Sequence, residues 1–296
     1  MFDLRYHVAS LAAVFVALVL GIFVGVGLSG KGFVSDAERE NLQAQIDGLR
    51  VERDDAVARA EDARQRGQAL DRFARATYAE LVDGRLDGSS VGVVFVGSVD
   101  QGIAGTVRRA VADAGGRVAL LRALRVPLDV EGVDAALRSE ADIQDLAGPD
   151  NRERLGRELA RELVAPGPNP VLDAISRVLV EEQSGASAAA LDALVVARSA
   201  RPQQGETEHF LAGLYSGLAA GRLPSVGVEK SDARASAVRV FRRRGLSTVD
   251  RIDTAPGQVS LVFLLAGARP GSYGIDEDAS DGVLPEPPPR PSPPEG

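Results

Sequence analysis

The stretch Val91-Gly-Val-Val-Phe-Val96 is a short apolar run with β-branched side chains, which is typical of a buried strand. A helical pattern follows over residues 106–114 and ends at Gly115-Gly116. The run Arg117-Val-Ala-Leu-Leu121 then indicates a second strand. A strand–helix–strand unit of this kind opens many Rossmann-like sheets.

The chain continues this alternation to residue 274, and so predicts an α/β domain over 90–274 with a mostly parallel sheet and helices on both faces. The further helices are expected at 130–141, 151–164, 170–182, 207–220 and 236–244, and the further strands at 194–197, 225–229, 248–253 and 259–265.

Before this domain, the residues from Val8 to Leu28 carry no charged side chain. A helix of this length spans about 31 Å, which matches the apolar core of a bilayer. Residues 1–30 are therefore interpreted as a single-pass membrane anchor, and Arg5 favours a cytoplasmic N-terminus with the bulk of the chain outside the cytoplasm. A cleaved signal peptide, cut near Gly27-Leu28-Ser29, is the alternative.

Within the anchor, Ala17, Gly21 and Gly25 recur every four residues. Small side chains on one stripe let two membrane helices approach closely, so the stripe favours helix packing. The frequency of glycine in membrane helices offers an equally simple explanation.

Residues 33–83 are predicted to form a coiled-coil stalk, because apolar side chains alternate at spacings of four and three between charged ones. A homodimer or higher homo-oligomer is the expected assembly, with a long amphipathic helix lying on the following domain as the alternative. The apolar seam positions are Leu42, Ile46, Leu49, Ala56, Ala60, Ala63 and Leu70.

After Gly274 the chain becomes acidic and then proline-rich, and residues 275–296 are expected to form a disordered tail. The carboxylates of Asp276, Glu277, Asp278 and Asp281 lack the ordered spacing of an EF-hand calcium loop.

The composition excludes several kinds of chemistry. The 296 residues include no Cys, one Met and two His, and the net charge is −8. Disulfides, thiolate metal sites and cysteine nucleophiles are therefore absent, and a general nucleic-acid binder is disfavoured. Weak candidates for holding a metal are Met1, His7 and His209.

No motif predicts an enzyme or a cofactor site. Gly97, Gly102 and Gly105 follow the first strand, but they lack both the G-x-G-x-x-G spacing and a following Gly-Lys-Ser/Thr. The run Gly213-Leu-Tyr-Ser-Gly217 misses the spacing of a nucleophile elbow, and a Ser–His pair would have to use His209, which is expected at the surface. Arg242-Arg243-Arg244 could bind an anion, but they also complement the dipole at the end of a helix.

Two motifs are similar to those of a known family. The opening from Phe2 to Gly25 and the run Gly245-Leu-Ser-Thr-Val-Asp-Arg-Ile-Asp-Thr-Ala-Pro-Gly-Gln-Val-Ser-Leu-Val-Phe263, followed by Tyr273-Gly274, resemble the mycobacterial copper transport protein B (MctB) family. The resemblance covers nearly the whole chain except the proline tail. It implies an actinobacterial envelope protein with a role in copper efflux or homeostasis, as a channel or channel-associated component, with copper as the transported ion.

The sequence is therefore compatible with two functions from different classes. The first is the copper-homeostasis role that the family implies, in a membrane protein that is not an enzyme. The second is a non-catalytic envelope scaffold that binds a protein partner in cell division or cell-wall remodelling. The family description also implies an outer-membrane location, although the repeated alternating segments of an outer-membrane barrel are absent from the sequence.

Overall fold

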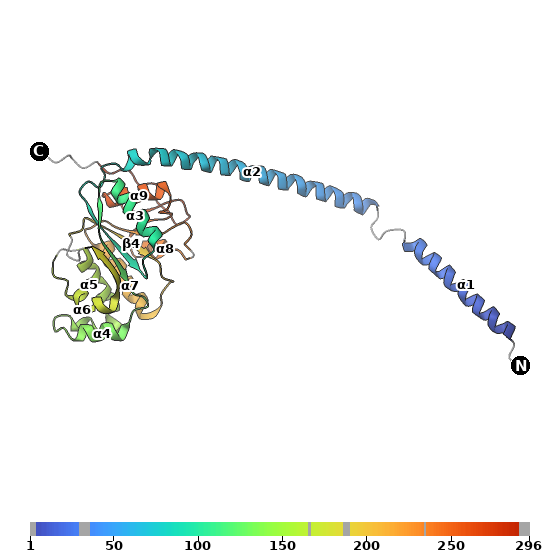
Figure 1. Ribbon diagram of the computed structural model, residues 1–296, viewed down its shortest axis with the longest axis horizontal. Helices are drawn as coiled ribbons and strands as arrows, with labels where there is room; N and C mark the ends of the chain where they lie inside the picture. Colours follow the sequence, from blue (N-terminus) through green and yellow to red (C-terminus); the bar gives the residue numbers. More distant parts are fainter. Residues whose placement is uncertain (1–3, 30–35, 165–166, 186–189, 234, 290–296) are drawn as a thin grey trace. The chain divides into compact units, whose positions relative to one another are not determined.

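The computed structural model describes residues 4–29, 36–164, 167–185, 190–233 and 235–289. The chain forms two compact units, Met1–Ala69 and Leu70–Gly296. Figure 1 labels the main helices of both units.

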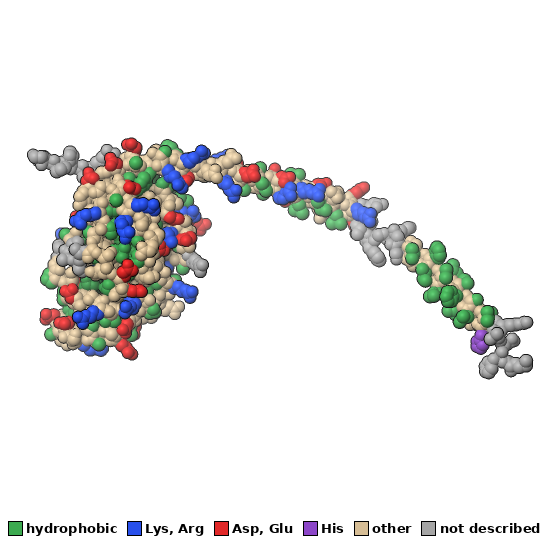
Figure 2. Space-filling model, in the orientation of Figure 1, with side chains coloured by type: hydrophobic (Ala, Val, Ile, Leu, Met, Phe, Trp, Pro, Cys, Tyr) green, Lys and Arg blue, Asp and Glu red, His purple; other side chains and the backbone are tan. Residues whose placement is uncertain are grey.

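The first unit contains α1 (Leu4–Ser29) and most of α2 (Asp36–Val82). Within α1, the segment His7–Gly27 has a mean hydropathy of 2.7 and is long and apolar enough to cross a membrane. Figure 2 shows hydrophobic side chains on every visible side of α1. An exposed helix of this composition is suited to contact with lipid or with another membrane helix.

The second unit is built on a seven-stranded sheet with the order β3-β2-β1-β4-β5-β6-β7. Neighbouring strands are parallel, except that β3 runs antiparallel to β2. The predicted α/β class with a mostly parallel sheet is therefore confirmed. The strands are β1 Ser90–Val96, β2 Arg117–Leu124, β3 Val180–Gly185, β4 Ala193–Arg198, β5 Ser225–Val228, β6 Ser247–Val249 and β7 Ser272–Tyr273.

Helices cover both faces of this sheet because successive strand side chains point to opposite sides. Val93 and Phe95 of β1 join one buried cluster, together with α3 (Gln101–Asp113), α9 (Ala255–Leu265) and the end of α2. Val94 and Val96 join the other. That second face is covered by α4 Val130–Arg138, α5 Arg152–Val164, α6 Pro170–Leu179, α7 Gly205–Ala220 and α8 Val238–Arg243, with short 3-10 helices at Gln144–Leu146 and Pro149–Asn151.

The closest helix contact joins α5 to α7 through glycines. A Cβ on Gly213 would lie 2.0 Å from the backbone oxygen of Glu153, and one on Gly217 would lie 2.6 Å from the Ala160 Cβ. From the other side, a Cβ on Gly156 would lie 2.1 Å from the Phe210 oxygen. The run Gly213-Leu-Tyr-Ser-Gly217 is thus a packing surface in the middle of a helix.

The expected strand at 259–265 is wrong: these residues lie in α9. An unbroken apolar run has no period that separates a strand from a buried helix, and this helix is buried along most of its length. The helix start is marked by Thr254, whose hydroxyl accepts a hydrogen bond from the Gly257 N–H, and by Pro256 in the first turn. The last strand of the sheet is instead the two-residue β7.

Residues 180–182 are also not helical, because α6 ends at Leu179 and the chain continues as the edge strand β3. Glu181 and Glu182 are exposed on this strand, and Gln183 accepts a hydrogen bond from the buried Arg122 at 3.0 Å. Similarly, β6 ends at Val249, so residues 250–253 form a turn where a longer strand was expected.

The C-terminal segment also differs from the expectation of a disordered tail starting at 275. Residues 275–289 have a described path, and the 281–282 backbone pairs with β7: the Asp281 N–H donates to Ser272 O and the Gly274 N–H donates to Gly282 O, both at 3.0 Å. Arg85 donates to the Pro288 carbonyl oxygen. Hydrogen bonds supply the order that the polar composition of the segment does not predict, and residues 290–296 lie outside the described part of the chain.

Candidate functional site

In open parallel sheets, ligands bind beyond the carboxyl ends of the strands, where the strand order changes direction. Here that point lies between β1 and β4. Gly97 follows β1 with φ +100°, and a Cβ there would lie 2.7 Å from Ser199 Oγ and 2.8 Å from Ala200 N. The Ser199 and Ala200 N–H groups both donate to Val96 O at 3.1 Å. The loop after β4 therefore narrows the usual ligand crevice, and Ser199 and Ala200 line the cavity that remains.

The helix N-terminus nearest to this crevice, that of α3, already has a hydrogen-bond acceptor from the protein itself. Asp100 caps α3 by accepting the Ile103 N–H at 3.0 Å, and it pairs with Lys230 Nζ at 3.0 Å. Burial acts to raise the pKa of Asp100, but the hydrogen bonds from Ile103 and Lys230 outweigh it and hold the pKa below its usual value. Gly102 and Gly105 lie within α3, so they do not form a phosphate-binding loop with Gly97 after β1. The Asp100 carboxylate therefore binds the N-terminus of α3, where a phosphate group would otherwise bind.

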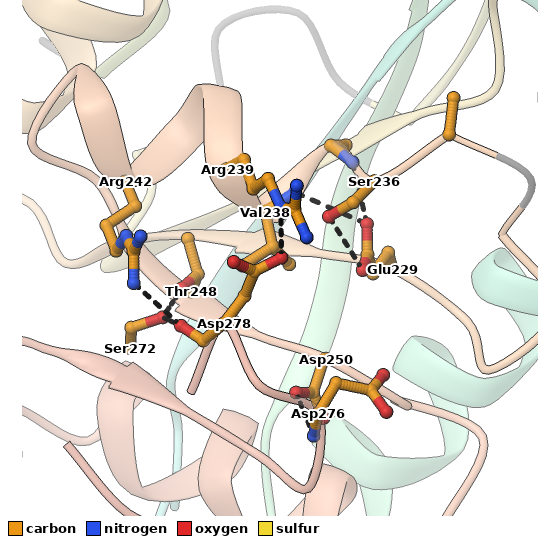
Figure 3. Close-up of polar contacts among 12 residues, drawn as sticks. Glu229, Ser236, Val238, Arg239, Arg242, Thr248, Asp250, Ser272, Asp276 and Asp278 are labelled. Carbon is orange, nitrogen blue, oxygen red and sulfur yellow. Dashed lines mark hydrogen bonds and ion pairs between the residues drawn. The ribbon is translucent and has the colours of Figure 1, made fainter. Parts of the chain in front are cut away.

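The same arrangement recurs at the end of β5. Glu229 accepts hydrogen bonds from Ser236 Oγ at 3.1 Å and from the Ala237 N–H at 2.7 Å, at the start of α8 (Figure 3). A cavity of about 320 Å³ lies beside Glu229 and Lys230, and the Lys230 ammonium within it is already paired with Asp100. This edge of the sheet is held together by internal ion pairs and caps.

After β6, Asp250 holds the first residues of the C-terminal segment. Asp250 is 1% exposed and accepts the N–H groups of Ile275 and Asp276, each at 2.9 Å (Figure 3). Gly274 has φ +150°, and a Cβ there would lie 1.9 Å from Asp250 Oδ1, so only glycine fits this approach. Burial raises the pKa of Asp250, although the two N–H donors act in the opposite direction.

Three further contacts fix the same segment. Arg251 pairs with Asp276 at 2.6 Å, and Arg239 pairs with Asp278 at 2.6 Å. Arg242 donates to the Asp278 carbonyl oxygen at 3.0 Å (Figure 3). The four carboxylates that lack EF-hand spacing thus include two ion-pair partners of arginines on the domain.

Replacing Asp250 with alanine is expected to destabilise the domain by about 2 kcal/mol, because two backbone N–H groups lose a charged acceptor. Limited proteolysis should then cut within 275–289 faster, and the urea midpoint should fall. The exposed neighbour Glu277 supplies the matched control, since Glu277→Ala should change stability by less than about 0.5 kcal/mol. Equal cleavage rates in the two variants would contradict the role assigned to Asp250.

The metal candidates lie in separate parts of the chain. Met1 lies outside the described residues, His7 is exposed on α1, and His209 is exposed on the first turns of α7. Among the described residues there is no group of three or more His, Asp or Glu side chains that could hold a metal ion. Ser216 lies seven residues after His209 on the same helix, about 10 Å along its axis, and donates to Ala212 O at 2.8 Å. The two side chains do not form a catalytic pair.

The small-residue stripe of α1 and the apolar seam of α2 are predictions about contacts between two copies of this chain. Gly21 and Gly25 on α1 have nothing within 4 Å of an added Cβ, and Ala17 is exposed. On α2, the seam residues Leu42, Ile46, Leu49 and Leu70 are 51%, 43%, 65% and 69% exposed, and Ala56, Ala60 and Ala63 are exposed as well. Both stripes are available to a partner and stay predictions.

The family described as "Copper transport outer membrane protein, MctB" matches residues 1–284. The chain belongs to the MctB family. The "Copper transporter MctB" of Mycobacterium tuberculosis (strain ATCC 25618 / H37Rv) is 27% identical over 319 residues, which cover 94% of this chain and 98% of that protein. The protein of the same name from Mycobacterium leprae (strain TN) is 26% identical over 340 residues, covering 97% and 100%.

The MctB match confirms the family that the sequence motifs indicated, and its extent includes α1, α2 and the whole sheet. It begins before α1 and ends at residue 284, so it includes Asp250, Gly274 and the residues that Asp250 holds. The names of these two relatives describe a transporter. Sequence reasoning missed the contact between Asp250 and the 275–276 backbone, although both of its ends lie in or beside the family motifs.

Proposed function

We propose that this MctB-family protein is a single-pass membrane component that limits the copper content of the cell, with its N-terminus in the cytoplasm and its α/β domain outside. The supporting observation is the family match over residues 1–284, which joins the apolar helix His7–Gly27 to the whole domain. Arg5, before the span, favours this orientation.

We further propose that the chain acts in copper homeostasis without coordinating copper along a path of its own. Cu(I) prefers thiolate, thioether and imidazole ligands, and the sequence has no Cys, one Met and two His. The two histidines are exposed on different units of the protein. A single membrane helix also cannot line a pore. Any copper path would need ligands from a partner or an oligomer.

The test is cell-associated copper, measured by mass spectrometry under copper challenge, in a strain that lacks its own MctB-family gene. Two complementing chains, the wild type and the His7→Ala/His209→Ala double variant, are compared with an empty vector. We expect both protein-expressing strains to hold less copper than the vector strain, because the proposed role needs neither imidazole.

Two outcomes contradict parts of this proposal separately. If the double variant accumulates copper like the vector while its protein level equals wild type, the histidines handle copper directly. If wild type fails to lower copper, and deletion instead alters cell length or septation, the copper role is wrong and the scaffold role replaces it.

The scaffold function remains the second candidate because α2 offers an apolar stripe to a second copy. The exposed seam residues have the spacing at which two helices pack knobs into holes. The proposed assembly is a homodimer through α2, aided by the small residues of α1, with the α/β domain free to bind an envelope protein.

Replacing Leu42, Ile46 and Leu49 together with glutamate is expected to convert the detergent-purified full-length protein from dimer to monomer. Like charges placed at the seam would face each other across the helix pair. Light scattering after size exclusion gives the mass. Val51 is 61% exposed on the same helix but lies off the seam, so Val51→Glu should leave the dimer intact. A dimer that survives the triple substitution would eliminate the coiled coil.

A further inference from the structure

A cavity of about 540 Å³ lies on the α7 and α8 side of the sheet. Its walls come from the end of β4 and the loop after it, from α7 between Glu208 and Tyr215, and from α8 with the residue that follows it. This volume falls within the range of small-molecule sites. The proposed copper role uses none of these residues.

Positively charged side chains line the cavity, although the protein has a net charge of −8. Three arginines line it, namely Arg198, Arg243 and Arg244, with Glu208 as the one carboxylate. Arg198 is positioned by donating to the Ala235 carbonyl oxygen at 2.9 Å. Guanidinium groups in this arrangement favour an oxyanion and repel a metal cation.

The three arginines of α8 and Arg244, which follows the helix, divide into two pairs. Arg239 and Arg242 are bonded to Asp278 of the C-terminal segment. Arg243 and Arg244 line the cavity instead, and no described residue pairs with either of them. Their charge is therefore available to a ligand, beyond the general preference for cations at the end of a helix.

Tyr215 provides an independent observation. It lines the cavity, is 1% exposed, and its hydroxyl is buried without a hydrogen-bond partner among the described residues. Its ring packs edge-on against Phe241 with the centroids 4.9 Å apart, which fixes the ring in place. Burial raises the pKa of Tyr215, so the hydroxyl stays protonated and can donate. Unpaired buried hydroxyls are rare, and a ligand at this wall would supply the missing acceptor.

Part of the remaining lining is apolar and includes Leu211 and Val240, beside the polar Gln203 and Glu208. A site that joins an apolar wall to a few convergent polar groups selects for molecules of matching character. We infer that this cavity binds a small organic oxyanion, whose carboxylate or phosphate contacts Arg198, Arg243 and Arg244 and whose apolar portion lies against Leu211 and Val240.

The test uses full-length protein in detergent at low ionic strength, with binding followed by isothermal titration calorimetry. The probes are phenyl phosphate and benzoate, which carry an oxyanion and a ring, inorganic phosphate, which lacks the ring, and benzamide, which lacks the charge. At least one of the two ring oxyanions should bind at least about tenfold more tightly than inorganic phosphate and benzamide. If phenyl phosphate alone binds, the natural ligand is a phosphate ester, and if benzoate alone binds, it is a carboxylate.

Substitutions locate the site. Arg243→Gln/Arg244→Gln should weaken binding of the preferred probe about 10- to 100-fold, because two charge-assisted contacts are lost. Arg242→Gln is the matched control, since this arginine on the same helix is bonded to Asp278 outside the cavity, and it should leave binding within about twofold.

Tyr215→Phe separates a binding role from a structural one. Removing an unpaired buried hydroxyl should keep or raise the melting temperature of the free protein, while it lowers the affinity for the preferred probe several-fold. The inference is overturned if neither ring oxyanion binds saturably, if benzamide or inorganic phosphate binds as tightly, or if Arg243→Gln/Arg244→Gln leaves affinity unchanged.

Discussion

Gly213→Ala is expected to destabilise the α/β domain by about 3 kcal/mol or more, although alanine is the better helix former. The added methyl group would lie 2.0 Å from the backbone oxygen of Glu153 and 2.7 Å from its carbonyl carbon. Backbone atoms cannot rotate away as a side chain can, so α5 and α7 would have to separate. That separation would open contacts between two helices that carry much of one core cluster.

Gly105→Ala is the matched control, because an added Cβ at this position in α3 meets nothing within 4 Å. It should stabilise the protein by about 0.5–1 kcal/mol. Urea unfolding followed by near-ultraviolet circular dichroism reports on the domain, since three of the four tyrosines, Tyr78, Tyr215 and Tyr273, lie in it. If the two substitutions shifted the midpoint in the same direction, the close helix contact would be wrong.

Arg152→Met is expected to cost about 3–5 kcal/mol at pH 7, since it leaves carboxylates without their buried partner. Arg152 on α5 has a side chain that is 1% exposed and bonds to Asp134 of α4 and to Glu206 of α7, each at 2.7 Å. One guanidinium thus joins three helices. Arg154→Met is the control, because that side chain is 50% exposed and its ion pair with Asp145 is at the surface.

The loss of stability caused by Arg152→Met should depend on pH. Burial acts to raise the pKa of Asp134, but hydrogen bonds from Arg152 and from the Gly148 N–H outweigh it and lower the pKa. In wild type, this ionised pair stabilises the fold above the unfolded pKa of about 3.9 and is lost as pH falls through the lower folded value. Without Arg152, Asp134 should take up a proton more readily as the pH falls. The difference in the free energy of unfolding between the variant and wild type should therefore shrink from pH 7 to pH 4. A constant difference across that range would contradict this account.

The sequence predicts those parts of the fold whose pattern is local. The strand β1 is an apolar β-branched run that ends before Gly97, and the same pattern predicts its partners β2 and β4 and the next strand, β5. The run 259–265 was misassigned because continuous apolar character has no period. The cap Thr254 and the first-turn Pro256 are the local signal that would have identified it as helical.

Contacts between distant segments could not be predicted in this way. The G-x-x-x-G spacing at Gly213 and Gly217 is visible in the sequence, but the backbone of α5 that it contacts lies about 60 residues earlier. Likewise, Asp250 follows a strand in the sequence, and nothing local shows that it will accept the N–H groups of Ile275 and Asp276. The composition of 275–289 by itself predicts disorder. The acceptor that orders its first residues, Asp250, lies outside this segment.

The two edges of the sheet limit how the domain can meet other proteins. At one edge, the 281–282 backbone already pairs with β7, which leaves little room for an incoming strand. At the other, β3 exposes Glu181 and Glu182, so two copies joined edge to edge would bring like charges together. Extension of the sheet by β-augmentation is therefore disfavoured at both ends, and recognition of this domain must rely on helix faces and loops.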